Sequence, residues 1–113
     1  MNIDDIAQIY DRFIEILEEF SLTPYEQIEK LHGTVVADEL ATDFSEIGMV
    51  YAKLLKDNQW LTEEQYKLME SIDNTLNEMS KQKSFWSNKA LVNSNEWASC
   101  RKKCEKLLKQ FKS

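Results

Sequence analysis

Residues 37–57 read ADELATDFSEIGMVYAKLLKD, and apolar side chains recur in this stretch at steps of three and four residues. The spacing predicts a helix of about five turns with one buried face, because residues three and four apart lie on the same side of an α-helix. The inward positions are Ala37, Leu40, Ala41, Phe44, Ile47, Gly48, Tyr51, Leu54 and Leu55. The rest of the chain must supply the helices that cover this face.

The same period occurs on both sides of this helix. It predicts further long helices and one short helix, near residues 3–20, 63–80, 95–111 and 24–32. Thr23 and Thr62 each stand three residues before a Glu or Gln, which is the spacing of a capping box at a helix start. Asn2 and Ser94 are the expected caps of the first and last long helices. Gly33 is suited to the left-handed residue that ends the short one.

The composition agrees with few, long elements. The chain has 113 residues, of which 42% are hydrophobic, and it has only two glycines and one proline. A sandwich or barrel would need turn residues at regular intervals. We therefore expect an all-α fold, a single compact bundle of about five helices that forms one domain over residues 1–113.

Charge is distributed unevenly along the chain. Residues 1–73 carry 17 Asp or Glu against 5 Lys or Arg, a balance of −12, whereas residues 74–113 carry 3 against 9, a balance of +6. An acidic surface repels phosphates, so nucleic acid is not the expected ligand. A basic protein partner is favoured.

The sequence pattern favours a cytoplasmic protein. The first residues lack the basic and apolar segments of a signal peptide, and no apolar run is long enough to span a membrane. Cys100 and Cys104 lie four residues apart in a helical pattern. We expect both to be reduced and buried, as is usual for cysteines in the cytosol.

The residues that usually carry catalysis are scarce. His32 is the single histidine, and there is no Gly-rich phosphate loop. We expect no enzyme activity, no cofactor, no metal and no small-molecule substrate. His32 with Cys100 and Cys104 would supply three zinc ligands, but the cysteines fit an apolar core face and the histidine fits a helix end.

A row of carboxylates marks the outer side of the helix at 37–57. Asp38, Glu39, Asp43 and Glu46 lie there, the last three at i, i+4 and i+7, and no lysine separates them. Like charges at this spacing repel each other. The row is either a solvated face or a patch that meets a basic partner; a carboxylate-bridged metal pair would need histidines that the chain lacks.

Trp60 is the tryptophan expected nearest the surface, since it falls in the connection between two long helices. It either packs within that loop or anchors a partner.

A resemblance covers roughly the C-terminal two-thirds of the chain. Its residues are Leu40-Ala41-Thr42-Asp43-Phe44, Leu61-Thr62-Glu63-Glu64, Ile72-Asp73, Phe85-Trp86, Glu96-Trp97, Arg101 and Leu107-Leu108. In spacing and residue type this run resembles small all-α immunity proteins of bacterial polymorphic-toxin and contact-dependent growth inhibition systems. The resemblance implies a protein that binds the C-terminal effector domain of a cognate toxin, often a nuclease.

The leading hypothesis is thus a cytoplasmic immunity protein, an antitoxin that neutralises a toxin effector domain by protein–protein interaction. Asp38, Glu39, Asp43, Glu46 and Trp60 are its candidate partner-binding residues. The alternative hypothesis is a helical adaptor or regulatory subunit that acts through an apolar groove, either as a monomer or as a homodimer.

Overall fold

A computed structural model describes residues 2–112 of the chain, and over these residues the protein is all-α. The elements, in chain order, are α1 (Ile3–Ser21), α2 (Pro24–Lys30), α3 (Val36–Thr42), the π-helical turn η1 (Asp43–Gly48), α4 (Met49–Asp57), α5 (Glu63–Met79), the 3₁₀ turn η2 (Lys83–Phe85), α6 (Asn88–Asn93) and α7 (Asn95–Lys112). The expected fold class and the expected helices are confirmed.

The caps predicted from the sequence are present. Thr23 and Thr62 form capping boxes with Glu26 and Gln65, in which the threonine hydroxyl accepts a backbone N–H and the longer side chain accepts the N–H of the threonine. The side chain of Asn2 caps α1, and the hydroxyl of Ser94 accepts the backbone N–H of Trp97 at the start of α7. Gly33 follows α2 with φ +89°, in the left-handed region.

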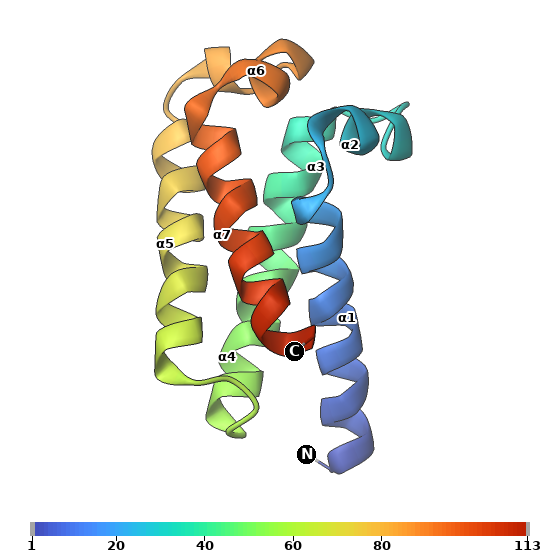
Figure 1. Cartoon of the computed structure of the whole chain (residues 1–113), viewed down its shortest axis with the longest axis vertical. Helices are drawn as coiled ribbons and strands as arrows, with labels where there is room; N and C mark the ends of the chain where they lie inside the picture. The colour runs from blue at the N-terminus through green and yellow to red at the C-terminus, as the bar shows by residue number, and fades with distance from the viewer. Residues whose placement is uncertain (1, 113) are drawn as a thin grey trace.

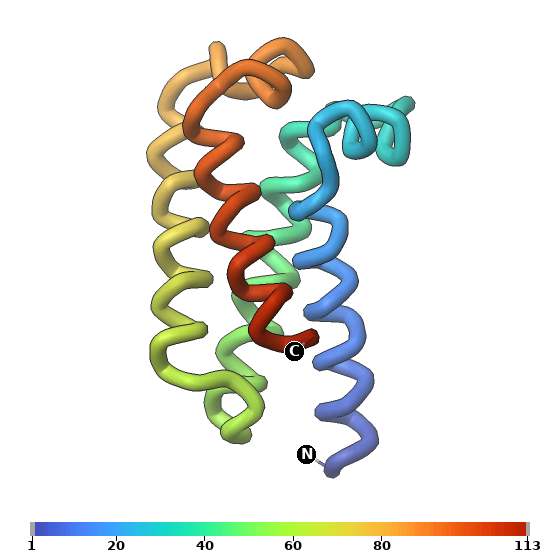
Figure 2. The backbone as a smooth tube through the Cα atoms, in the orientation of Figure 1, coloured from blue at the N-terminus to red at the C-terminus, as the bar shows by residue number. Residues whose placement is uncertain are grey.

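The long helical segments form a four-helix bundle with two short caps. The four members of the bundle are α1, the continuous segment formed by α3, η1 and α4, then α5, and finally α7. Figure 1 shows them side by side, with α2 and α6 covering one end of the bundle. The chain runs up and down alternately along these segments, as the colours of Figure 2 show. Each segment packs against two neighbours: α1 against α4 and α7, and α5 against the same two helices.

The core is apolar and rich in aromatic rings. Trp97, Phe13, Phe20 and Phe44 are among the largest fully buried side chains. Phe20 contacts both Phe44 and Trp97, with ring centroids 5.4 and 5.9 Å apart, and Trp97 contacts Trp86 at 5.6 Å. Such ring pairs add to the stability that burial provides, so they hold α1, η1 and α7 together near the capped end.

A buried polar cluster joins α2, α6 and α7. Arg101 on α7 is 9% exposed, and its Nη2 donates to the side-chain oxygen of Gln27, at 3.2 Å, and to the carbonyl of Leu91, at 3.1 Å. Its Nε is buried without a hydrogen-bond partner. The head of Arg101 thus has an amide and a carbonyl as its hydrogen-bond partners.

Candidate partner-binding surface

The predicted carboxylate row is divided between two sides of the bundle. Glu39 and Asp43 lie close enough to Glu19 of α1 for the three carboxylates to interact, and both are half-buried. Asp38 is exposed and lines a different hollow, between α3, the end of α5 and Trp86. Adjacent helical positions are separated by about 100°. This rotation sends Asp38 and Glu39 to different neighbours.

The π-helical turn disturbs the alignment expected for Glu46. In η1 the backbone N–H of Met49 bonds to the carbonyl of Phe44, five residues earlier. A π-helical turn therefore holds more residues than an α-helical turn, and the i, i+4, i+7 alignment of Glu39, Asp43 and Glu46 is not kept. Glu46 is exposed one turn further along the segment.

Residues of α1, α3 and η1 together form an acidic strip, defined here by Glu19, Glu39 and Asp43. The pKa of Asp43 is raised above its ordinary value, first by burial and then by the nearby charges of Glu39 and Glu19; Arg12 opposes this shift. Both causes disfavour the ionised carboxyl. A cationic side chain placed beside the strip would relieve the repulsion.

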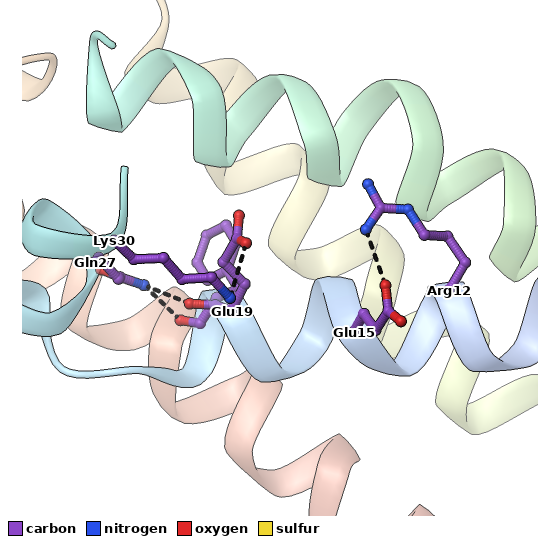
Figure 3. A network of polar contacts seen from close by, with 6 residues as sticks. Arg12, Glu15, Glu19, Gln27 and Lys30 are labelled. Atoms are coloured by element: carbon purple, nitrogen blue, oxygen red, sulfur yellow. Dashed lines mark hydrogen bonds and ion pairs between the residues drawn. The ribbon is translucent and has the colours of Figure 1, made fainter. Parts of the chain in front are cut away.

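Two cationic side chains lie near this strip, and each forms an ion pair with a carboxylate of α1. Arg12 Nη1 lies 3.3 Å from Glu15 Oε2, and Lys30 Nζ lies 3.4 Å from Glu19 Oε2. Figure 3 shows Arg12 and Glu19 projecting from α1 toward the neighbouring helix, with Gln27 beneath. The pair of Arg12 with Glu15 is largely exposed and contributes little to stability, so a partner can replace it at small cost, whereas Glu19 is only 20% exposed in its pair with Lys30.

The basic final helix leaves this side of the bundle acidic. α7 packs against α1 and α5, whereas η1 packs against α1 and continues into α3 and α4. Among the residues described, the ion pair that joins α7 to α1 is Lys112 Nζ to Glu18 Oε2, at 3.2 Å. The positive charge of α7 therefore does not cover the acidic strip.

Trp60 is 40% exposed and has a structural role that explains its position. Its backbone N–H bonds to the carbonyl of Leu55, and the N–H of Gln59 bonds to that of Lys56, while Gln59 has φ +66°. These bonds form a Schellman motif that ends α4. The Trp60 ring packs on Tyr10 of α1, with centroids 5.5 Å apart, and leaves part of its surface free for a partner.

The other sequence candidates lie within the fold. Cys100 and Cys104 are buried free thiols, and burial raises the pKa of Cys100 to about 11. His32 is exposed and its Nδ1 lies 2.8 Å from the carbonyl of Glu29 in the last turn of α2. Within residues 2–112 no group of three or more His, Cys, Asp or Glu side chains is arranged to hold a metal ion. Each helix in that range is too short or too polar to cross a membrane.

Sequence reasoning missed the contribution of α1 to the acidic strip. Glu15 and Glu19 repeat the i, i+4 pairing of Glu39 and Asp43, so the same like-charge signal was present in the first helix. What the sequence did not indicate is that Glu19 would lie beside Asp43, because that depends on how α1 packs against η1.

Comparison with protein-family models finds no match for the chain. Searches of curated proteins and of solved structures also find none.

Proposed function

We propose that this protein is a cytoplasmic immunity protein that binds and neutralises the effector domain of a cognate toxin, and that it acts by occupying a surface and not by catalysis. The acidic strip on α1, α3 and η1 is the main contact, and the expected partner is a basic domain such as a nuclease. Nucleic acid, membranes and small substrates are outside the proposed activity.

The observation that carries this proposal is the concentration of carboxylates on two adjacent helices. α1 contains six Asp or Glu and one Arg, and the segment 36–57 contains five Asp or Glu and two Lys. The helix with the most basic residues, α7, packs against α1 and α5, and its ion pair with α1 is made to Glu18, outside the acidic strip. Charge of one sign on one side of a small domain steers a partner of the other sign and speeds its association.

The raised pKa of Asp43 supports the same proposal. Its carboxyl is held near two others although this arrangement disfavours the charged form. An arginine or lysine from a partner would pair with these carboxylates as the complex forms. The repulsion present in the free protein would thus become attraction in the complex.

The test is capture of the product of the adjacent reading frame, followed by affinity measurement with the double variant Glu39→Gln/Asp43→Asn. These changes keep side-chain shape and remove repulsion, so the fold is expected to be at least as stable as before. Affinity is expected to fall at least about 100-fold, since close charge pairs across an interface are worth about 1.5 kcal/mol or more each. The association rate is expected to fall as salt rises.

The matched control is Glu70→Gln/Glu78→Gln, which removes the same charge from exposed positions on α5. Its affinity is expected to stay within about twofold of the unaltered protein. Equal losses in the two double variants would show that only net charge matters, and no loss in either would exclude the acidic strip as the contact surface.

A second candidate, an adaptor that works as a homodimer, is favoured by one groove. Ile14 of α1 and Phe111 of α7 line an open groove of about 430 Å³, with Glu15 and Glu18 on one bank and Lys112 on the other. Because the two banks carry opposite charges, the acidic bank of one copy could meet the basic bank of a second copy related to it by a two-fold axis. Sedimentation distinguishes the candidates, because a tight dimer at low micromolar concentration favours the adaptor.

A further inference from the structure

Asp38 lies in a hollow with a composition unlike that of the acidic strip. The hollow has a volume of about 420 Å³ and is lined by Asp38, Ala41, Thr42, Ser80 and Trp86. These residues come from the start of the long segment 36–57, from the end of α5 and from the residue after η2. The site therefore sits where three segments meet, toward the end of the bundle that α2 and α6 cover (Figure 1).

Its polar atoms are hydrogen-bond acceptors. Asp38 is exposed, and its carboxylate accepts up to two N–H groups of one planar donor. The hydroxyl of Ser80 already donates its proton to the carbonyl of Asn77, so its lone pairs remain for a ligand. Thr42 also lines the hollow, and a threonine hydroxyl can accept a hydrogen bond. A ligand with several donors matches this set.

Trp86 supplies an aromatic wall that is held in place from behind. Its indole N–H donates to the carbonyl of Met79 at 3.0 Å, and its ring meets Trp97 edge to face at an interplanar angle of 87°. With its donor engaged, the ring offers a ligand its π surface. Tryptophan is the aromatic side chain that attracts cations best.

We propose that this hollow receives an arginine side chain of the protein partner. A guanidinium is flat enough to stack on the ring of Trp86, and it has five N–H donors for the carboxylate of Asp38 and the hydroxyls of Thr42 and Ser80. A lysine ammonium would use the charge but neither the stacking nor the fork of donors. The proposal rests on the proposed function and adds a second contact, separate from the acidic strip.

Lysines near this site in the chain weaken the binding of ligands that offer only positive charge. Lys81 is paired with Glu78, with Nζ 3.1 Å from Oε1. Lys83 and Lys89 are exposed within three residues of Trp86 in the chain, and their charge repels every cation, so charge alone gains a ligand little here. The hollow therefore favours a ligand that combines stacking, hydrogen bonding and charge over one that offers charge alone.

The experiment titrates the protein by itself with blocked arginine, N-acetyl-arginine amide, and follows the indole N–H of Trp86 by NMR. Millimolar saturable binding is expected. Blocked citrulline, which has the same shape without the charge, and blocked lysine are each expected to bind at least about tenfold more weakly. Asp38→Asn should weaken the arginine probe about tenfold or more, whereas Glu70→Gln, which removes the same charge from an exposed position of α5, should leave it unchanged.

The proposal is overturned if the Trp86 signal does not respond to the arginine probe, if citrulline binds equally well, or if Asp38→Asn has no effect. Binding of inorganic phosphate at Trp86 in place of the arginine probe would also overturn it, since the lysines would then dominate the site. No toxin is needed for this titration. A failure here leaves the capture experiment and the acidic strip to be judged on their own results.

Discussion

The buried side chain of Gln27 is expected to contribute more to stability than any other polar residue of α2. It is fully buried, its Nε2 donates to the carbonyls of Glu19 at 3.2 Å and Phe20 at 2.9 Å, and its oxygen accepts from Arg101. The last carbonyls of a helix lack partners within the helix. Gln27 thus satisfies the end of α1 and the head of Arg101 at once.

We expect Gln27→Met to destabilise the protein by about 3 kcal/mol. Methionine keeps the length of the side chain but removes its hydrogen bonds. Each of two buried groups left without this partner, the Phe20 carbonyl and the Arg101 guanidinium, costs about 1–3 kcal/mol, and the more apolar side chain offsets roughly 1 kcal/mol. The Glu19 carbonyl still accepts the N–H of Leu22, so it adds little.

The assay is urea unfolding, followed both by far-ultraviolet circular dichroism and by tryptophan fluorescence. Gln8→Met, at an exposed position of α1, is the control and should change stability by no more than about 0.5 kcal/mol. In the double variant Gln27→Met/Arg101→Met no charge is left unpaired. Its loss should therefore be smaller than the sum of the single losses by about 1 kcal/mol or more.

Two results would refute this reasoning. A loss below about 1 kcal/mol for Gln27→Met would mean that the cluster is not a buried, fully engaged unit. Strict additivity in the double variant would mean that Gln27 and Arg101 do not depend on each other.

Three further predictions concern single groups. The folded-state pKa of Asp43 lies above 3.8, so the folded protein holds the proton more tightly and stability falls as pH rises through that folded pKa. NMR titration should show the raised value, Arg12→Gln should raise it further, and Asp43→Asn should flatten the pH dependence of unfolding. Gln59→Gly should stabilise the protein by about 1 kcal/mol in urea unfolding, because Gln59 has a left-handed φ of +66°; a loss of stability would contradict this. With a pKa of about 11 and a buried side chain, Cys100 should not react with a thiol reagent at pH 8 until the protein unfolds, and fast labelling of the native protein would show that the helix opens.

The sequence predicted the residues of the candidate site but not how the fold groups them. Spacing along the helix identified Asp38, Glu39, Asp43 and Glu46. The carboxylates Glu15 and Glu19 of α1 show the same i, i+4 spacing of like charges. The division of the predicted residues into an acidic strip and a separate hollow did not follow, because it depends on which neighbour covers each side of the helix. The π-helical turn was also hidden, since its residues keep an apolar pattern that an α-helix would share.

The sequence by itself determined the long helices, the short helix α2 and the capped starts of α1, α2, α5 and α7. Capping by Asn2, Thr23, Thr62 and Ser94 and the period of three and four residues act within one or two turns, so nearby residues suffice to predict them. Only the tertiary structure decided that Glu19 lies beside Asp43, that Asp38 and Trp86 line one hollow and that Gln27 joins α1 to Arg101. Each of these contacts joins segments distant in the chain, and its geometry arises from the packing of the whole bundle.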